Sequence, residues 1–342
     1  MAEQPSVSIL IPTLNEERHI GDVLEACIAQ TYPAELIEVF VVDGGSTDDT
    51  RKEFDRFVGR LPALAWLDNP DRRQADGLNL ASNQSTGEVL VRWDAHARYP
   101  DDYVETAVRL LQDPGVDVVG GQWTPTGTST FEDAAAAAMA SRIGVGSDRY
   151  APVDRRRVVD TVSCGVMTRE TFDAVGGFDT SLWPAGEDAD LMFRIRAEGG
   201  VVVLDPTLEV LYFPRGTTRE LARQYYGYGL AKAAMLLKHR AFPSLRPLAP
   251  ALLVGALVAS VVSPWPGGST KWIISAYGGV LVVGSIVSVQ GSLSRRLRAA
   301  GVAPLMHIPY GVGVWVGVGS AAVGLLASGP SSTTEKNGGR GS

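Results

Sequence analysis

An aspartate and a histidine two residues apart follow a strongly apolar segment. Asp94 and His96 come directly after residues 89–93, which are Val-Leu-Val-Arg-Trp. Because side-chain direction in an extended chain repeats every two residues, both side chains point to the same side. A carboxylate and an imidazole placed in this way can hold a divalent ion, and that ion can bind a diphosphate. The alternative interpretation is a loop-capping aspartate beside a solvated histidine.

Three carboxylates stand close together further along the chain, at Glu187, Asp188 and Asp190. They fall at the expected start of a helix, where acidic side chains complement the helix dipole. If one of them faces a pocket instead, it can act as a general base and take a proton from an attacking hydroxyl group. The spacing alone leaves both interpretations open.

Polar residues after this cluster begin with Arg215, in the sequence Tyr-Phe-Pro-Arg-Gly, and continue with Arg219, Arg223 and Gln224. These side chains could contact the phosphates of a lipid-linked acceptor. They could equally be the solvated charges of a helix at a membrane surface, and periodicity does not choose between the two.

Two turns near the N-terminus carry further polar side chains. Residues 12–16 are Pro-Thr-Leu-Asn-Glu, and residues 43–48 are Asp-Gly-Gly-Ser-Thr-Asp. Asp43 could accept hydrogen bonds from a base or a ribose, and the glycines would allow a ligand to approach closely. Both turns are also compatible with plain strand-to-helix connections.

The elements that must position these residues alternate between strands and helices. Apolar segments typical of buried strands and segments with helical periodicity follow one another in this order: strand 7–11 (ended by Pro12), helix 20–30, strand 37–42, helix 47–58, strand 64–67, helix 77–84 and strand 89–93. This alternation predicts an α/β fold with a mostly parallel sheet covered on both faces. Ligands collect at the carboxyl ends of such strands, so the loops 12–16, 43–48 and 94–98 are expected to converge on one site.

Charge is distributed unevenly along the chain. The 342 residues carry 31 basic and 38 acidic side chains, and this net charge of −7 argues against a general nucleic-acid-binding protein. Beyond residue 220, however, the only acidic residue is Glu335. A soluble domain rarely has such a composition, whereas a segment in or beside anionic lipid often does. The part before residue 220 is therefore expected to lie in water, and the part after it in or beside the lipid bilayer.

Three uncharged or nearly uncharged segments follow in the second part, at residues 248–263, 272–290 and 305–327. Spanning a bilayer takes about 20 residues with a lower limit near 17, so the second and third qualify and the first is marginal. The alternative is buried core helices. Basic residues at 238–246 and 295–298 place the large domain and the loop at 295–298 on the cytoplasmic side by the positive-inside rule. Three spans would leave residues 329–342 outside the cell, as a tail expected to be disordered.

Six segments together resemble the family 2 glycosyltransferases, in the order in which they occur there. They are PTLNE, VVDGGSTDDT, NPDRRQADGLNLASNQSTGEVLVRWDAHARYP, CGVMTRETFDAVGGFD, GEDADLMFRIRAEGG and YFPRGTTRELARQYYGYGLAK. The resemblance covers about residues 6–240 and is strongest to the succinoglycan-type, membrane-associated branch, whose members carry Asp-Ala-His where others carry Asp-x-Asp. It implies a GT-A fold, a Rossmann-like sheet with flanking helices, that binds a nucleotide sugar and inverts the anomeric carbon.

The resemblance also implies roles for individual residues. It assigns the nucleotide sugar to Pro12, Thr13, Asn15, Glu16, Asp43, Arg73, Gly77, Asn79 and Asp94, a divalent Mn²⁺ or Mg²⁺ to Asp94 and His96, the catalytic base to Asp188, and the acceptor or its phosphates to Glu187, Trp183, Arg215, Arg219, Arg223 and Gln224. A UDP-sugar is favoured over a GDP-sugar as the donor.

The expected organisation is a GT-A catalytic domain at residues 1–220, an amphipathic interfacial segment at 221–247, about three transmembrane helices at 248–328 and a tail at 329–342. The expected function is an inverting, metal-dependent hexosyltransferase at the cytoplasmic side of the cell membrane. It would extend a saccharide on a polyprenyl-diphosphate carrier, in exopolysaccharide or cell-wall glycan synthesis.

Four other functions fit parts of the sequence. Transfer to polyprenyl phosphate needs no base, because a phosphate oxygen is already ionised. A non-catalytic nucleotide-sugar-binding scaffold would need none of the carboxylates. A processive synthase is disfavoured because the sequence has no Gln-x-x-Arg-Trp, and a nucleotidyltransferase because no glycine-rich, lysine-bearing loop lies near the N-terminus.

Overall fold

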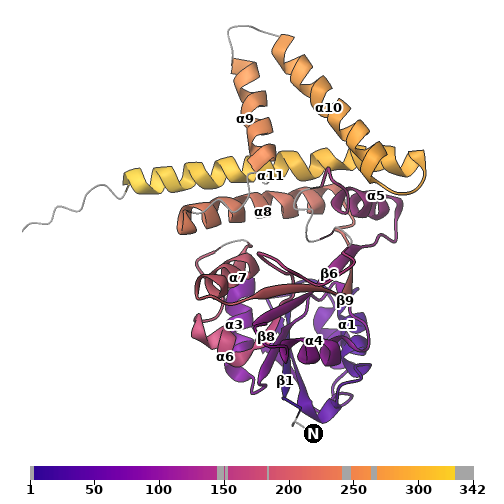
Figure 1. Ribbon diagram of the computed structural model, residues 1–342, viewed down its shortest axis with the longest axis vertical. Helices are drawn as coiled ribbons and strands as arrows, with labels where there is room; N and C mark the ends of the chain where they lie inside the picture. Colours follow the sequence, from indigo (N-terminus) through magenta and orange to yellow (C-terminus); the bar gives the residue numbers. More distant parts are fainter. Residues whose placement is uncertain are drawn as a thin grey trace, which may run out of the picture.

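A mixed α/β domain and a group of C-terminal helices make up the molecule (Figure 1). The computed structural model describes residues 4–144, 150, 153–182, 185–240, 248–262 and 268–327. Its strands form one sheet in the order β3-β2-β1-β4-β8-β6-β9-β5, with β7 paired to β9. The predicted fold class is confirmed.

The first half of the sheet is parallel throughout, as the alternating pattern predicts. Its elements in chain order are β1 (Val7–Thr13), α1 (Ile20–Ile28), a short 3₁₀ helix (Ala34–Leu36), β2 (Ile37–Asp43), α2 (Thr50–Asp55), β3 (Leu64–Asp68), α3 (Gln74–Gln84) and β4 (Val89–Arg92). Alternate residues of β1 enter separate cores, since Ile9 and Ile11 pack with α1 whereas Leu10 packs with α3. The strands are therefore apolar on both faces.

The second half of the sheet is mixed. Here β8 pairs antiparallel with β4 and β6, and β9 pairs parallel with β6. The elements are β5 (Ala97–Arg98), α4 (Tyr103–Leu111), β6 (Val118–Pro125), α5 (Thr130–Met139), β7 (Arg157–Val158), β8 (Val166–Thr168), α6 (Arg169–Ala174), α7 (Glu187–Ala197) and β9 (Val202–Tyr212). Strand β9 is the last strand of the chain, and the helices that follow it lie over the edge of the sheet where the parallel strands end.

Several element boundaries differ from the sequence prediction by a few residues, and two of these differences lie beside the cavity. Strand β1 does not end at Pro12 but continues to Thr13, with Pro12 opposite Val42. On the side of β1 that faces β4, the pairing stops at Leu10. Pro12 can therefore lie within β1 without loss of a hydrogen bond, because the N–H group that it lacks would have had no partner strand on that side. Helix α2 begins at Thr50 with Asp49 as its N-cap, whereas the sequence predicts Thr47 or Asp48 as the cap. The Thr47 N–H donates instead to the Asn15 side chain at 2.8 Å.

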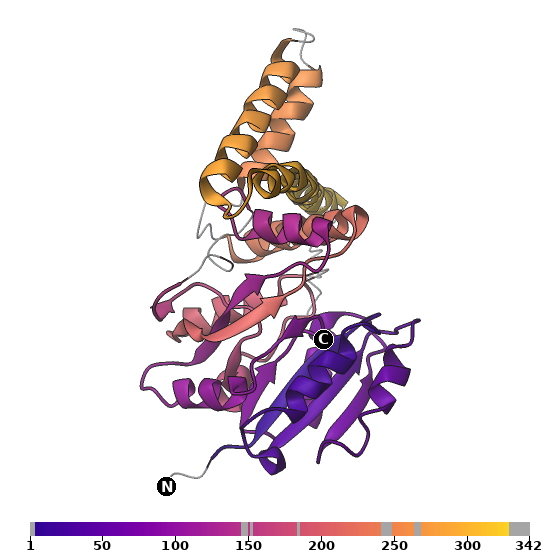
Figure 2. The same cartoon turned by 90° about the vertical axis from the view of Figure 1, so that its right-hand side faces the viewer.

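Helix α8 (Thr218–His239) lies between the α/β domain and the last three helices (Figures 1 and 2). These are α9 (Ala249–Val262), α10 (Gly268–Ser288) and α11 (Leu293–Ala327). Helix α11 runs alongside α8, whereas α9 and α10 project away from both. The α8 and α11 backbones touch, since a Cβ atom added at Gly313 would come within 2.3 Å of the Tyr226 carbonyl oxygen.

Two described helices contain stretches long and apolar enough to cross a membrane, at Thr270–Ser288 and Leu293–Ala321, and Ala249–Val261 is a shorter apolar helix. These stretches overlap the three apolar segments found in the sequence. The predicted basic loop at 295–298 is instead the first turn of α11, which also contains Pro304 and Pro309. Residues 241–247 and the predicted disordered tail lie outside the described residues.

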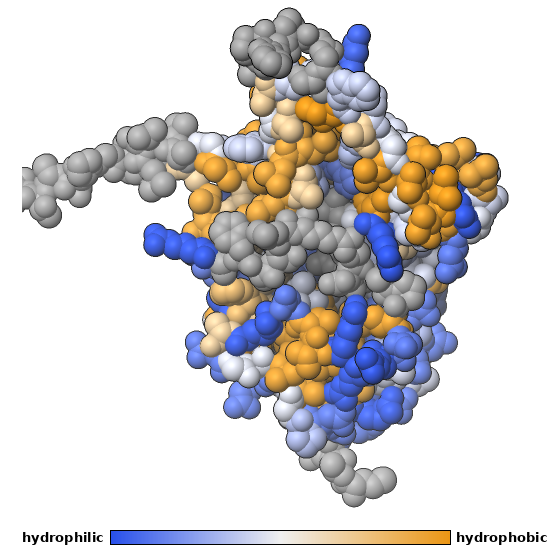
Figure 3. All heavy atoms as spheres, turned by 45° about the horizontal axis from the view of Figure 1, so that its top comes forward, coloured by the Kyte–Doolittle hydropathy of each residue, from blue (hydrophilic) through white to orange (hydrophobic). Residues whose placement is uncertain are grey.

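Apolar side chains cover much of these helices (Figure 3). Large exposed ones include Leu252 and Val258 on α9, and Trp272 and Val287 on α10, with Trp272 78% exposed. Surfaces of this kind on a water-facing protein are unusual unless they meet lipid or another protein.

Candidate active site

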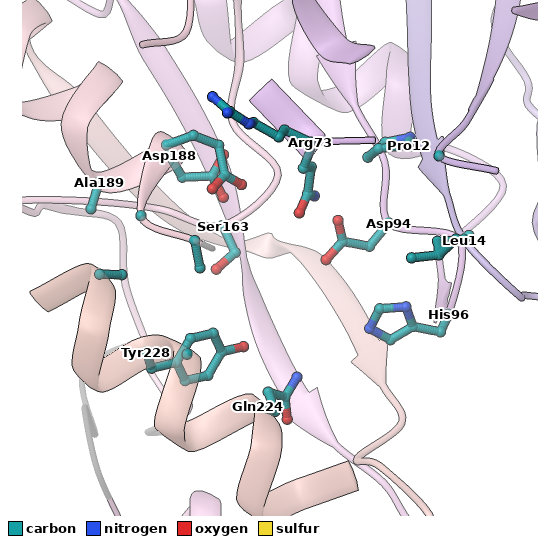
Figure 4. A pocket seen from close by; sticks show the side chains of 18 of the residues that line it. Pro12, Leu14, Arg73, Asp94, His96, Ser163, Asp188, Ala189, Gln224 and Tyr228 are labelled. Carbon is teal, nitrogen blue, oxygen red and sulfur yellow. The ribbon is translucent and has the colours of Figure 1, made fainter. Parts of the chain in front are cut away.

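A cavity of about 760 Å³ lies between the carboxyl ends of the parallel strands and helix α8 (Figure 4). One wall comes from the loops after β1 and β4 and from the start of α7. The opposite wall comes from α8, and Tyr310 of α11 also lines the cavity. The cavity is therefore shared between the α/β domain and the C-terminal helices.

The three loops meet as the strand pattern predicts. Thr13, Gly44 and Asp94, one from each loop, all line the cavity. Hydrogen bonds join the first two loops, because the Asn15 N–H donates to Ser46 Oγ at 2.8 Å while the Asn15 side chain accepts from Thr47. The loops are thus held to each other at the carboxyl edge of the sheet.

Asp94 presents a charged carboxylate to the cavity. Its backbone N–H donates to the Tyr99 hydroxyl at 2.7 Å, and Oδ1 lies 3.0 Å from Arg92 Nη2. Burial opposes ionisation, but the nearby charges of Arg92 and His96 outweigh it and lower the pKa of Asp94. The carboxylate is therefore ionised at neutral pH.

His96 lies beside Asp94 at the same end of the cavity (Figure 4). Its Nδ1 is 3.1 Å from Glu16 Oε1, and Arg215 Nη1 is 3.7 Å from the same oxygen. Burial would raise the pKa of Glu16, but the hydrogen bond and charge of His96 and the charge of Arg215 lower it overall. Glu16 is thus an ionised carboxylate that orients the imidazole.

This arrangement fits a metal ligand pair, although the described residues contain no cluster of three or more His, Cys, Asp or Glu side chains able to hold an ion. An imidazole that gives one ring N–H to a carboxylate offers its other nitrogen to a metal. Asp94 and His96 would thus supply two ligands and leave open positions for phosphate oxygens or water.

Glu187 and Asp188 face this pair from the start of α7, and both line the cavity. The buried guanidinium of Arg92 lies between the two sides. Its Nη1 contacts Asp188 Oδ1 and is 3.3 Å from Glu187 Oε1. Burial and the charge of Asp188 raise the pKa of Glu187 to about 7. One arginine therefore neutralises carboxylates on both sides of the site.

Asp190 has a different role from its two acidic neighbours. It is fully buried and pairs with Arg194 at 2.7 Å, Lys238 at 2.5 Å and His239 at 2.7 Å. Because Lys238 and His239 belong to α8, these contacts join α7 to the last turn of that helix. Of the three carboxylates, only Glu187 and Asp188 reach the cavity.

Most of the predicted site residues line the cavity. These are Pro12, Thr13, Glu16, Arg73, Asp94, His96, Glu187, Asp188, Arg215, Arg223 and Gln224. Trp183 falls outside the described residues.

Five predicted residues are not among those that line the cavity: Asn15, Asp43, Gly77, Asn79 and Arg219. The Asp43 carboxylate accepts hydrogen bonds from the N–H groups of the Gly-Gly-Ser turn that follows it. The Asn79 amide pairs with the backbone of Phe178 at 2.8 and 2.9 Å. Gly77 packs against Asn69 and Val42. Arg219 is an exposed residue in the first turn of α8. Asn15 is also exposed, and its side chain joins the loop after β1 to the loop after β2. In this structure these side chains shape the loops around the cavity rather than its surface.

The cavity residues that sequence reasoning missed include Arg92, Tyr212, Tyr228 and Lys232. Arg92 stands two residues before Asp94 in an apolar strand. Because a charged residue is rarely buried unless it is paired, its position there could have indicated a functional ion pair. Tyr228 and Lys232 follow Gln224 at helical spacing, so they lie on one face of α8.

Comparison with known proteins agrees with this geometry. Residues 8–176 match the family model described as Glycosyl transferase family 2. The chain is 34% identical over 315 residues to succinoglycan biosynthesis protein ExoA of Rhizobium meliloti (strain 1021), which covers 90% of this chain and 93% of that protein. It is 26% identical over 241 residues, 68% of this chain and 74% of that protein, to a dolichyl N-acetyl-alpha-D-glucosaminyl phosphate 3-beta-D-2,3-diacetamido-2,3-dideoxy-beta-D-glucuronosyltransferase of Methanococcus voltae.

A solved structure is also similar. It is the mannosyltransferase PcManGT from Pyrobaculum calidifontis in complex with GDP-Man and Mn²⁺, with a TM-score of 0.55 and 25% identity, covering 96% of this chain and 89% of that one. Sequence identity that extends over nine tenths of the chain, together with this shared fold, shows that the protein belongs to glycosyltransferase family 2 and is of the ExoA type.

Proposed function

We propose that this protein transfers a sugar, with inversion, from a nucleotide-diphosphate donor to a saccharide carried on a polyprenyl diphosphate. The observation that carries the proposal is the placement of Asp94 and His96 opposite Asp188 across one cavity. A donor whose diphosphate is held at Asp94 and His96 would present its anomeric carbon toward Asp188. The products would serve exopolysaccharide or cell-wall glycan synthesis, as the similarity to a succinoglycan biosynthesis protein suggests.

Asp94 and His96 would hold a divalent ion, Mn²⁺ or Mg²⁺. When bound, such an ion offsets the charge that develops on a leaving nucleoside diphosphate, which is worth several kcal/mol. Support comes from the ionised state of Asp94, from the Glu16 contact that orients His96, and from the Mn²⁺ present in the similar mannosyltransferase.

Asp188 would act as the general base. The acceptor hydroxyl gives its proton to the Asp188 carboxylate while its oxygen attacks the anomeric carbon. The bond from that carbon to the diphosphate breaks, and the nucleoside diphosphate leaves with the bonding electron pair. Arg92, in contact with Asp188, fixes the position of the carboxylate during this step.

The donor base can be tested directly. The sequence favours a UDP-sugar, but the similar mannosyltransferase holds GDP-Man, so both classes belong in the panel. The full chain in detergent is mixed with each nucleotide sugar and Mn²⁺, and its melting temperature is recorded. A true donor raises the melting temperature because it binds only the folded state.

Transfer itself is then measured with the selected donor and a polyprenyl-diphosphate saccharide. Chelation of divalent ions should stop transfer, and Mn²⁺ or Mg²⁺ should restore it. Full activity in chelator would refute the metal-ligand assignment of Asp94 and His96. Binding of donors without transfer to any acceptor would favour the scaffold alternative.

The C-terminal helices would attach the catalytic domain to the cytoplasmic face of the membrane. The exposed apolar side chains of α9 and α10 support this placement. So does the basic start of α11, where Arg295 Nη2 lies 2.9 Å from Asp133 of α5. This contact keeps the cationic turn on the side of the catalytic domain, in agreement with the positive-inside rule.

A further inference from the structure

The α8 wall of the cavity carries a row of polar side chains. Gln224, Tyr228 and Lys232 are four residues apart, and all three line the cavity. Figure 4 shows Gln224 and Tyr228 reaching from α8 toward the side that holds Asp94 and Asp188. The row therefore faces the proposed site of chemistry from the acceptor side.

Lys232 differs from three cations in and beside the cavity that are paired with carboxylates. Arg92 and Arg215 lie beside carboxylates of the opposite wall, and Lys238 at the end of α8 pairs with Asp190. Within the described part of the chain, no carboxylate lies within the 4.0 Å of an ion pair with Lys232. Half-burial in the cavity wall lowers the pKa of its ammonium group by more than the charge of Asp160 raises it. An anion bound there would offset this cost of desolvation.

The surroundings of Lys232 indicate what kind of anion would fit. Two apolar residues near it on α8, Ala231 and Met235, line the cavity as well, and so does Tyr310 of α11. Helix α11 continues into the apolar C-terminal region. A cation beside an apolar lining suits an amphiphile with a charged head and a hydrocarbon chain. An ammonium group binds phosphate as a compact point charge.

We propose that Lys232 binds the phosphate group of an acceptor that carries an apolar chain. The inference rests on the proposed function, since it assigns the acceptor side of the same cavity. The phosphate could belong to a lipid monophosphate, which is itself glycosylated, or to a lipid diphosphate that carries a saccharide. The two sources share the chemistry that Lys232 would recognise.

Binding of short prenyl compounds tests the assignment without any need for transfer. The full chain in detergent is titrated with farnesyl phosphate, farnesyl diphosphate and farnesol. For Lys232→Gln we expect affinity for the two phosphates to fall about 10- to 100-fold, the usual effect of losing a charge-assisted contact. Affinity for farnesol should stay the same, because that compound has no phosphate.

Two matched variants separate this role from a general effect of charge. Lys232→Arg keeps the cation and should retain phosphate binding within a few-fold. Arg240→Gln removes a positive charge from the exposed C-terminal cap of the same helix and should leave binding unchanged. Nucleotide-sugar binding should be the same in all three variants, because the donor is assigned to the opposite wall.

The proposal is overturned if Lys232→Gln binds farnesyl phosphate and farnesyl diphosphate as the wild type does, or if it loses farnesol to the same extent. Transfer assays with a polyprenyl phosphate and with a polyprenyl-diphosphate saccharide then identify the source of the phosphate. If the wild type transfers sugar to neither, yet phosphate binding depends on Lys232, the site stands and the proposed function falls. If the wild type transfers sugar and Lys232→Gln keeps the same KM for the acceptor, the proposed function stands and the phosphate site at Lys232 falls.

Discussion

Arg92 shows how one side chain can connect two parts of a reaction centre. It leaves a strand of the parallel sheet and lies between Asp94 on one side and Glu187 and Asp188 on the other. Three carboxylates around one guanidinium leave excess negative charge in a buried space. Burial of Glu187, together with the nearby charge of Asp188, raises its pKa to about 7.

A first prediction concerns the base. Asp188→Asn keeps the shape of the side chain but removes its ability to accept a proton, so transfer to a hydroxyl acceptor should fall roughly 10² to 10⁴-fold. Donor binding, measured by the shift in melting temperature, should be retained. Unchanged turnover would remove Asp188 from this role, and it would favour a phosphate acceptor that needs no base.

A second prediction follows from the ionisation of Glu187. Its pKa is about 7 in the folded protein and near 4.5 when unfolded, so the folded state holds the proton more tightly. The stability that this difference provides is complete below pH 4.5 and is lost as pH rises to about 7. Glu187→Gln imitates the protonated group, so its advantage over the wild type should appear as pH rises through this range.

The size of that advantage should reach about 1–3 kcal/mol at pH 8. Melting temperatures of the two proteins at pH 5 and pH 8 provide the test. An equal difference at both pH values would show that Glu187 does not titrate between them.

At the scale of elements, the sequence predicts the sheet and its loops well. The apolar strands β1, β2 and β4 are recognisable because burial on both faces of a parallel sheet leaves a continuous apolar run. The spacing of the carboxylates does not separate Asp188 from Asp190, which stand on the same helical turn, and it was the family resemblance that assigned the base to Asp188. Only the contact of Asp190 with α8 assigns it to packing, and that contact depends on residues about fifty positions away.

The same limit applies to Arg92, Tyr228 and Lys232. Their side chains acquire a role only when α7 and α8 are placed against the ends of the strands. Local pattern gives the face of a helix, but it does not say what that face meets. Long-range packing therefore forms the α8 wall of the cavity, which the sequence predicted only in part.

A third prediction concerns the contact between α8 and α11. Gly313→Ala would place a methyl group within 2.3 Å of the Tyr226 carbonyl oxygen, so the two helices would have to move apart. We expect a loss of about 1–3 kcal/mol in stability, the usual cost of overpacking. The matched control is Gly319→Ala on the same helix. There the described residues outside the helix's own backbone place no atom within 4 Å of an added Cβ, and helix propensity favours alanine. A similar drop in melting temperature for both variants would contradict the role of this contact.

At the scale of the whole molecule, the acidic catalytic domain and the apolar helices meet at α8. A fourth prediction is that the full chain stays in the membrane fraction after a high-salt wash and is extracted only by detergent. The physical reason is that apolar contacts do not weaken with ionic strength, whereas attraction between basic residues and anionic lipid does. Release by salt alone would show that the basic residues, rather than α9 and α10, carry the attachment.

The close fit of α11 on α8 has a practical consequence for anyone who wishes to work with a water-soluble fragment. A protein cut after Arg240 would keep the residues proposed to bind the nucleotide sugar, yet it would lose Tyr310 from the cavity and uncover the face of α8 that contains Gly229. Such a fragment would report on donor chemistry only. A version suited to screening inhibitors of the complete reaction has to retain the last helix, with the projecting pair α9 and α10 as the segment to shorten.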